Sequence, residues 1–377
     1  MPGLWRAIVS KRSTAEDRRM CRDGACAGTG SERWGMLRRL YHMTEIDVWA
    51  RRLNRHSRYR SIRRLACRWT REARSRLARG LLLTGFVLLG SSQVHAHDER
   101  AAPPHLPFYI ATKSGQTIYV LGTLHVGYPS DFPSYQPFRP VILNALSASR
   151  TLAFELSPDD IVMSPDSVTR DGVCPRDCLR RMLPAALWQR LAARLRGDPA
   201  ALAEIRRMKP WLAALVIETL SSQQAGLQTE YGTEAQLENI YLRGSIVGLE
   251  SMDDQMRAFN GLSLPEQWEM LAQDLTQTPA EDVADVRKLH ALWLAGDADK
   301  LAAWQAAKTA TLMHTPELAH ALDERIVFRR NRHFVVKMLL IASPGHPLFV
   351  AIGALHLGGP QGVLALLRSY GFSVKAG

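Results

Sequence analysis

Short apolar runs bounded by turn residues stand near residue 110 and again at the end of the chain, and they predict β-strands. The runs FYIAT (108–112) and TIYVLGTLHV (117–126) are separated by the turn KSG (113–115). A short connection that contains glycine favours a β-hairpin. Near the C-terminus, LFVAIGALHL (348–357) and FSVKA (372–376) have the same apolar character. Both ends of this region are therefore predicted to supply strands.

Between these strands the spacing of apolar residues is mostly helical. Residues 179–223 and 252–341 carry apolar side chains three and four positions apart, and Pro210 marks a helix start or a kink. Two more helices and two more strands are expected, at VILNALSAS (141–149), GVLALLRSYG (362–371), TLAFEL (151–156) and SIVGLE (245–250). This order predicts a mixed α/β fold, in which N- and C-terminal segments form a central sheet around a large helical insertion.

The positive charge of the chain, +12 in total, is confined to its first part. Residues 1–96 contain 21 Lys and Arg against 7 Asp and Glu, whereas residues 97–377 contain 27 against 29. A nucleic-acid-binding domain concentrates positive charge on its own folded surface. We therefore expect no nucleic-acid partner.

The basic part ends in a segment typical of a secretory signal. Arg79 precedes the apolar run Leu81–Leu89, and polar residues and a small-residue cleavage site ending at Ala96 follow it. This apolar run is too short for a membrane span, which takes roughly 20 residues. We expect residues 79–96 to be a signal peptide, the protein to be periplasmic or secreted in a bacterium, and no stable transmembrane anchor to remain. An uncleaved short anchor is the alternative.

The remaining N-terminal residues, 1–78, lack apolar periodicity and are rich in Arg, Ser and Gly. They are expected to be disordered, or an extension upstream of the true translation start. The folded domain is therefore expected at residues 97–377.

Only two of the five cysteines, Cys174 and Cys178, fall in this domain. An isolated pair four residues apart in an exported protein favours a disulfide. A redox site would use Cys-x-x-Cys, and a zinc site would need two more ligands nearby.

Two predicted strands end in the same signature, GTLHVG around His125 and GALHLG around His356. Glu155 and Glu250 end two further apolar runs. Ligands of open α/β sheets bind beyond the carboxyl ends of the strands, so these four side chains are candidate site residues. Two imidazoles and one or two carboxylates form a ligand set for a divalent metal with open positions.

The alternative for each of these residues is a structural role in the core or on the surface. The charged run DERIVFRRNRH (323–333) is by default a solvated helix face, although Arg330 and Asn331 project inward if the helix covers the sheet edge. His290 shows no site pattern and is expected on the surface. The chain lacks a Gly-x-Ser-x-Gly elbow, a Walker loop and a His-Glu-x-x-His motif, which disfavours serine hydrolases, nucleotide hydrolases and zincins.

The two histidine signatures flank six further blocks in a fixed order: LAFEL, MKPWLAA, YGTEAQL, IVGLESMDDQMRAFNGLS, WLAGDADKL and RRNRHF. This series resembles the TraB/GumN family, which is related to the Tiki metalloproteases and more distantly to erythromycin-esterase and ChaN-like proteins. The resemblance covers the chain from about residue 109 to residue 374. It implies an α/β fold of the erythromycin-esterase/ChaN type.

The resemblance also implies a metal centre between the two histidine blocks. Carried over to this chain, the ligands of a manganese, cobalt or zinc ion are His125, Glu155 and His356. Further site residues implied nearby are Glu250 as general base or ligand, Arg330 as a charge for the oxyanion, Asn331 and Glu234. The family usually has Gly-x-Asp where this chain has Glu234 two residues after Gly232.

The function expected from the resemblance is that of an exported metal-dependent hydrolase, similar to a peptidase, in which metal-activated water attacks a peptide, amide or ester bond. The first alternative is a periplasmic binding or regulatory protein that keeps the site without turnover. The second is haem binding through a histidine, as in ChaN-like relatives.

Overall fold

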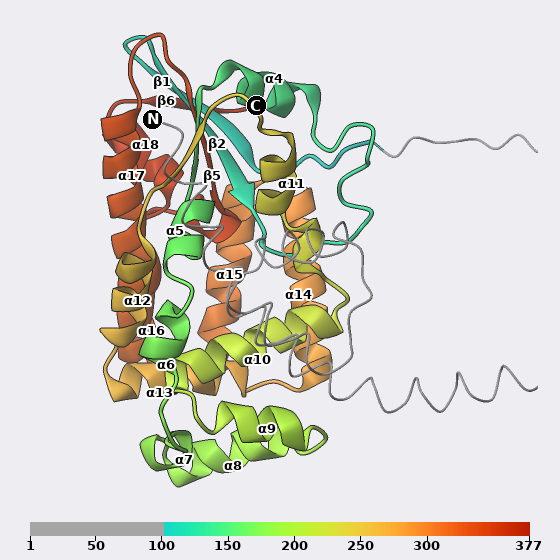
Figure 1. Cartoon of the computed structure of the whole chain (residues 1–377), viewed down its shortest axis with the longest axis vertical. Helices are drawn as coiled ribbons and strands as arrows, with labels where there is room; N and C mark the ends of the chain where they lie inside the picture. The colour runs from blue at the N-terminus through green and yellow to red at the C-terminus, as the bar shows by residue number, and fades with distance from the viewer. Residues whose placement is uncertain (1–101) are drawn as a thin grey trace, which may run out of the picture. The chain divides into compact units, whose positions relative to one another are not determined.

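The structure, a computed structural model, describes residues 102–377, so the predictions for residues 1–78 and 79–96 lie outside it. A six-stranded mixed sheet in the order β4-β3-β5-β2-β1-β6 forms its centre (Figure 1). The strands are β1 (Phe108–Lys113), β2 (Gln116–Thr123), β3 (Thr151–Phe154), β4 (Ser245–Gly248), β5 (Leu348–Gly353) and β6 (Ser373–Ala376). The predicted mixed α/β class is confirmed, and β4 adds a strand from within the helical part of the chain.

The predicted hairpin is formed by β1 and β2. The two strands are antiparallel, and Lys113 pairs with Gln116. Ser114 and Gly115 between them have φ of 46° and 78°. Two positive φ values in succession are those of a type I′ turn, whose twist matches that of the flanking strands.

Four neighbouring strands of the sheet, β4, β3, β5 and β2, are parallel to one another. Their carboxyl ends therefore lie along one edge of the sheet. The strands are shorter than the apolar runs predicted, because β2 ends at Thr123 and β5 at Gly353. The residues that follow these ends, both signature histidines included, lie in turns beyond the sheet.

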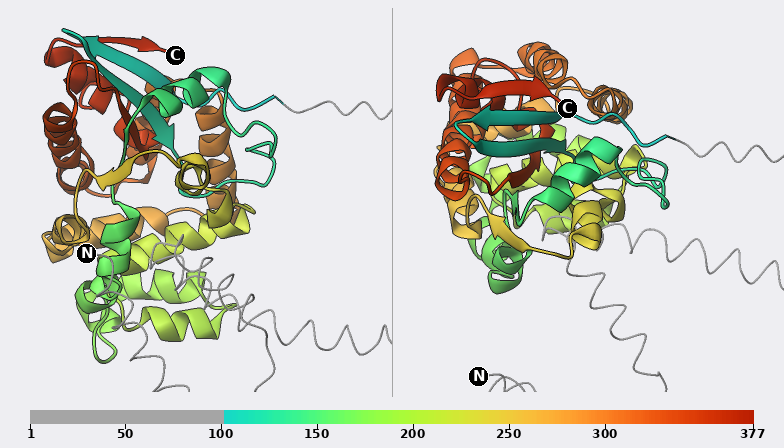
Figure 2. Two further views of the ribbon diagram at one scale, coloured as in Figure 1. Left: turned by 45° about the horizontal axis from the view of Figure 1, so that its top comes forward. Right: turned by 90° about the horizontal axis from the view of Figure 1, so that it is seen from above.

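Helices cover both faces of the sheet (Figure 2). On one face, Phe334, Met338 and Leu364 pack against Val120 and Val350 of the strands. On the other face, residues of α4, α11, α14 and α15 pack against apolar side chains of β1, β2, β3 and β5. The covering helices are α17 (Arg329–Ile341) and α18 (Val363–Ser369) on the first face, and α4 (Pro140–Ala148), α11 (Thr233–Ile240), α14 (Pro279–Leu294) and α15 (Ala298–Leu312) on the second.

The remaining helices form a second core beyond the carboxyl edge of the sheet, which Figure 1 shows below the strand ends. They are α5 (Pro158–Met163), α6 (Ser167–Gly172), α7 (Leu179–Met182), α8 (Ala185–Arg194), α9 (Pro199–Ile205), α10 (Pro210–Gln224), α12 (Met252–Asn260), α13 (Leu264–Asp274) and α16 (Pro316–Asp323). Short helical turns occur at η1 (Thr229–Tyr231), η2 (Glu324–Phe328) and η3 (Ala354–His356). Among the described residues, no helix has both the length and the apolar character needed to cross a bilayer.

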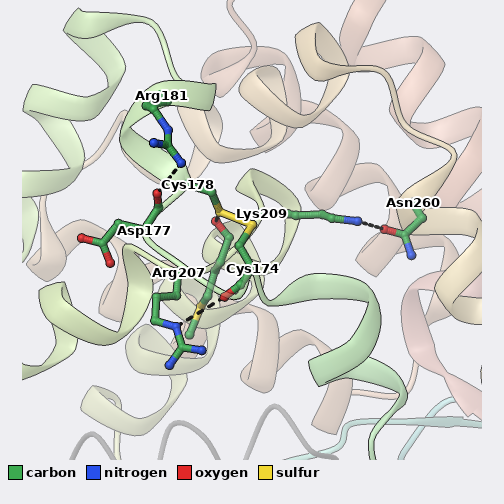
Figure 3. Close-up of a disulfide and its surroundings, with 8 residues drawn as sticks. Cys174, Asp177, Cys178, Arg181, Arg207, Lys209 and Asn260 are labelled. Atoms are coloured by element: carbon green, nitrogen blue, oxygen red, sulfur yellow. Dashed lines mark hydrogen bonds between the residues drawn. A yellow bond between two sulfur atoms is a disulfide. The ribbon is translucent and has the colours of Figure 1, made fainter.

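Cys174 and Cys178 are joined by a disulfide in the loop before α7 (Figure 3). The backbone amide of Cys174 donates to the carbonyl of Arg207 at 2.7 Å, and that of Cys178 donates to the carbonyl of Arg206 at 3.0 Å. The bridge and these bonds fix the loop to the segment that follows α9.

Candidate functional site

Four ionisable side chains follow the carboxyl ends of four adjacent parallel strands. In the order of the strands across the sheet, Glu250 follows β4, Glu155 follows β3, His356 lies in the turn after β5, and His125 follows β2. Glu155, Glu250 and His356 are buried, whereas His125 is exposed. The strand ends therefore place all four predicted residues along one edge.

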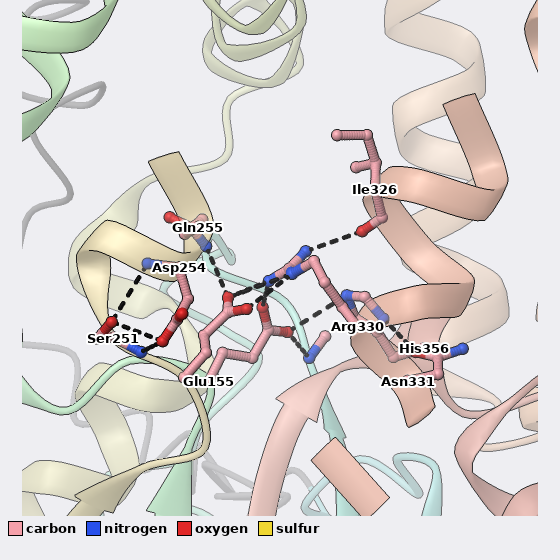
Figure 4. A network of polar contacts seen from close by, with 10 residues as sticks. Glu155, Ser251, Asp254, Gln255, Ile326, Arg330, Asn331 and His356 are labelled. Atoms are coloured by element: carbon pink, nitrogen blue, oxygen red, sulfur yellow. Dashed lines mark hydrogen bonds and ion pairs between the residues drawn. The ribbon is translucent and has the colours of Figure 1, made fainter. Parts of the chain in front are cut away.

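Glu155 is held from two sides. Its Oε1 accepts a hydrogen bond from the Gly353 amide at 2.8 Å, and its Oε2 accepts from Arg330 Nη2 at 2.6 Å (Figure 4). The turn after β5 thus donates to the carboxylate that follows the neighbouring strand β3. Both oxygens are engaged, so the position of the carboxylate is fixed.

Arg330 joins Glu155 to Glu250. Its Nη2 donates to Glu250 Oε1 at 2.6 Å, and its Nε lies 3.1 Å from Glu250 Oε2. Its Nη1 donates to the backbone carbonyl of Ile326 at 3.2 Å. That carbonyl lies in the π-helical turn η2, which immediately precedes α17. A π-turn of this kind often marks a functional position in a helix, and here it brings a single guanidinium between two buried carboxylates.

The charges around Glu155 set its ionisation. Burial alone would raise the pKa of Glu155, but neighbouring positive charges, those of His356 and Arg330 above all, lower it to about 2. For His356 burial acts in the opposite direction and lowers the pKa to about 4, so the imidazole is neutral near pH 7. Arg330 is therefore the charge that keeps Glu155 ionised there. The pKa of Glu250 is raised by burial, against the opposing effect of Arg330.

His356 has a fixed tautomer. Its Nδ1 lies 2.6 Å from Asn331 Oδ1, while Asn331 Nδ2 donates to the Gln361 carbonyl at 2.9 Å. Because the amide oxygen accepts, the imidazole proton lies on Nδ1 and the lone pair on Nε2. Nε2 stands 3.6 Å from Glu155 Oε1, which is beyond hydrogen-bond distance. Two electron-pair donors thus face each other in a buried place.

His125 is oriented in the same manner. Its Nδ1 lies 3.1 Å from Glu234 Oε1, which also accepts from the Thr123 hydroxyl. Burial would raise the pKa of Glu234, but the charge of His125 and these hydrogen bonds lower it. Glu234 Oε2 is buried and has no hydrogen-bond partner within residues 102–377. A carboxylate behind a histidine is a common support for a metal-ligating imidazole.

The predicted residues therefore fall into two connected groups. In the first group, hydrogen bonds join Glu250, Arg330 and Glu155, and the hydrogen-bonded pair of Asn331 and His356 stands beside Glu155. Glu234 with His125 forms the other group. The charge of His125 acts to lower the pKa of both Glu155 and His356. Within the described part of the chain, no three or more His, Cys, Asp and Glu side chains are grouped so as to hold a metal ion. The atoms that fit an ion as they stand are His356 Nε2 and Glu155 Oε1.

Some functional contacts were not evident in the sequence. Gln255 Nε2 donates to Glu250 Oε1 at 3.3 Å, and nothing in the helical pattern singled it out.

His290, expected on the surface, is buried, and its Nε2 lies 2.7 Å from Asp131 Oδ2. That expectation was wrong because apolar spacing alone does not reveal a buried contact between a histidine and a carboxylate. The pair connects α14 to the loop after His125.

Comparison with known proteins agrees with the motif series. The family model described as the TraB/PrgY/gumN family matches residues 107–376. No curated protein and no solved structure gives a significant match. The matched range includes all six strands and every side chain of the site described above. The chain therefore belongs to the TraB/PrgY/gumN family.

Proposed function

We propose that this protein is a metal-dependent hydrolase that cleaves peptide, amide or ester bonds. The observation that carries the proposal is the pair formed by His356 Nε2 and Glu155 Oε1, 3.6 Å apart and both buried. Two lone pairs that face each other in a buried site repel unless a proton or a metal ion lies between them. Since the pKa of His356 is about 4, no proton is available there near pH 7. A divalent cation fits the pair instead.

The side chains that would hold the ion are His125, Glu155 and His356. Imidazole nitrogen and carboxylate oxygen suit manganese, cobalt and zinc. When bound, such an ion lowers the pKa of a water molecule to about 7 and polarises the bond under attack. Asn331 and Glu234 hold the protons of the two imidazoles on Nδ1, which leaves each Nε2 as the ligating atom.

Glu250 is suited to take up a proton during the reaction. Its pKa is raised by burial, which is what a general base working near neutral pH requires. Its Oε1 receives three hydrogen bonds, from Gln255 and from Nε and Nη2 of Arg330, whereas its Oε2 receives one. Oε2 is therefore the oxygen with room to accept the proton.

Arg330 has two functions in this proposal. It keeps Glu155 ionised through the bond from Nη2. Its hydrogens on Nε and Nη2 are used by carboxylates, and one hydrogen on Nη1 is used by the Ile326 carbonyl. The second Nη1 hydrogen remains for a developing oxyanion, whose stabilisation is usually the largest electrostatic contribution to catalysis.

The test combines metal content with hydrolysis. Protein purified without chelator is analysed for transition metals beside the double variant His125→Ala/His356→Ala, and both are incubated with a pool of unstructured peptides. About one equivalent of metal and cleavage in the parent alone supports the proposal. A folded Glu155→Gln variant that keeps both metal and cleavage would refute it.

A binding or regulatory protein without turnover is the second candidate. It is favoured by the absence, within residues 102–377, of a ready-made group of three metal donors, and by the position of Arg330 between two carboxylates. Metal-loaded parent protein that cleaves nothing in the peptide pool supports this candidate. Cleavage by the parent that is lost in His125→Ala excludes it.

The location proposed for the protein is the periplasm or the exterior of a bacterial cell. The basic and apolar pattern of residues 79–96 supports export, although it lies outside the described residues. The Cys174–Cys178 disulfide also supports it, because disulfides persist in oxidising compartments. N-terminal sequencing of protein from cell fractions tests this, with a first residue after position 96 expected in the extracytoplasmic fraction.

A further inference from the structure

A pocket of about 340 Å³ opens beside the candidate site, between α12 and the helix made by α16, η2 and α17. Its floor includes Glu250 and Arg330. Three further arginines line it, Arg257, Arg325 and Arg329, together with His333. Its volume falls at the lower end of the range of small-molecule sites, so it can take part of a substrate rather than a whole protein domain.

The carboxylates around the pocket neutralise most of these arginines. Arg257 pairs with Asp254, and Arg325 Nε lies 3.0 Å from Glu266. Arg329 differs, because it is exposed and forms no hydrogen bond or ion pair through its side chain with any residue from 102 to 377. Its charge helps to lower the pKa of Glu324, but that carboxylate is paired with Arg332. One guanidinium in the lining is therefore available for a ligand.

Three side chains that line the pocket come from one face of the helix that contains the π-turn. The backbone amide of Arg329 donates to the carbonyl of Glu324, five residues earlier. Arg325, Arg329 and His333 follow one another at intervals of four residues, about one helical turn each, and all three line the pocket. Arg330, one position further on, reaches the carboxylates of the floor instead.

We infer that this pocket binds a carboxylate of the substrate, with Arg329 as its main partner. The inference rests on the proposed hydrolase function and narrows its substrate class to peptides that present a carboxylate to this pocket. A guanidinium presents a planar fork that matches a carboxylate, and the bond between two charged groups is stronger than a neutral one. Glu250 at the floor repels an anion, so the carboxylate lies at the rim near Arg329. The neutral backbone of the peptide then lies toward Glu250 and Arg330.

The carboxylate has two sources, the C-terminus of a peptide or an acidic side chain. Three fluorescent penta-alanine probes separate them: one with a free C-terminal carboxylate, one with a C-terminal amide, and one amide with a single Asp replacing an alanine. Binding to chelator-treated protein is measured by fluorescence anisotropy. We expect one or both acidic probes to bind about tenfold more tightly than the neutral amide.

The variant Arg329→Gln is expected to abolish that preference, while Arg287→Gln, which removes an exposed arginine of α14 outside the pocket lining, keeps it. Equal binding of all three probes to the parent, or an unchanged preference in Arg329→Gln, overturns the inference. The measurement needs neither metal nor turnover. A protein that shows the preference but never cleaves a peptide therefore refutes the proposed function alone.

Discussion

The backbone amide of Gly353 donates a hydrogen bond to Glu155 Oε1 at 2.8 Å, from the end of one parallel strand to the residue that follows its neighbour. A Cβ added to Gly353 would lie 3.1 Å from the same oxygen and 3.4 Å from Cδ2 of His356. The glycine of the second histidine signature therefore lets a buried carboxylate reach the backbone. This close approach is a physical reason for glycine at that position.

We expect Gly353→Ala to displace the Glu155 carboxylate by a few tenths of an ångström and to weaken its bond to the Gly353 amide. The free energy of unfolding should fall by about 1–2 kcal/mol, as measured by urea denaturation. Gly197→Ala is the matched control, because a Cβ there meets nothing within 4 Å. Equal stability of the two variants would contradict the proposed role of the close approach.

Removal of Arg330 should be far more costly than removal of a surface arginine on the same helix. Arg330→Gln leaves Glu155 and Glu250 buried without a counter-charge, and the expected loss is about 3–5 kcal/mol of unfolding free energy. Arg332 pairs with Glu324 while about half exposed, so Arg332→Gln should change stability by less than about 1 kcal/mol. Urea denaturation of both variants at one ionic strength measures the contrast. Similar losses would show that the buried network contributes little.

Much of the sheet and of the site edge was predictable from the sequence. Strand patterns are local, and the rule that ligands lie beyond strand ends needs only the positions of those ends. His125, Glu155, Glu250 and His356 could thus be selected without knowledge of any contact. The order of the strands in the sheet places the four strands that precede these residues side by side. This order was not evident in the sequence and was seen only in the structure.

The contacts that give the site its chemistry were not predictable. The bridge from Arg330 to both carboxylates follows a π-turn, whose Ile326 carbonyl accepts from the same guanidinium, and a π-turn has no clear sequence signal. Within residues 179–223 the apolar spacing also did not show where one helix ends and the next begins. The structure divides this stretch among α7, α8, α9 and α10. Short turns there follow from tertiary packing and not from the apolar period.

The buried pair of Asp131 and His290 should hold the loop that follows His125. Asp131 Oδ2 lies 2.7 Å from His290 Nε2 and accepts the backbone amide of Tyr128, also at 2.7 Å. Asp131→Asn replaces a charged acceptor by a neutral amide, and we expect a loss of about 1–3 kcal/mol of unfolding free energy. Hydrogen exchange should become faster in residues 127–138. If exchange there is unchanged, the pair does not determine the position of the loop.

The pH dependence of stability should show that the ionised form of Asp274, on α13, destabilises the fold. Burial raises the pKa of Asp274 well above its ordinary value of 3.8, the charge of Glu218 raises it further, and Arg194 opposes both. An acid whose pKa is raised by folding binds its proton more tightly in the native state than in the unfolded state. Its ionised form therefore destabilises the fold, and this cost is fully present above the folded pKa.

Asp274→Asn removes that cost, so the variant should be more stable than the parent at neutral and higher pH. The difference should shrink as the pH falls through the folded pKa and should vanish below 3.8, where Asp274 is protonated in both states. Urea denaturation at a series of pH values measures it, beside Asp166→Asn, which removes one exposed carboxylate from the surface. If Asp274→Asn is less stable than the parent at pH 7, ionised Asp274 is a favourable partner of Arg194 and does not destabilise the fold.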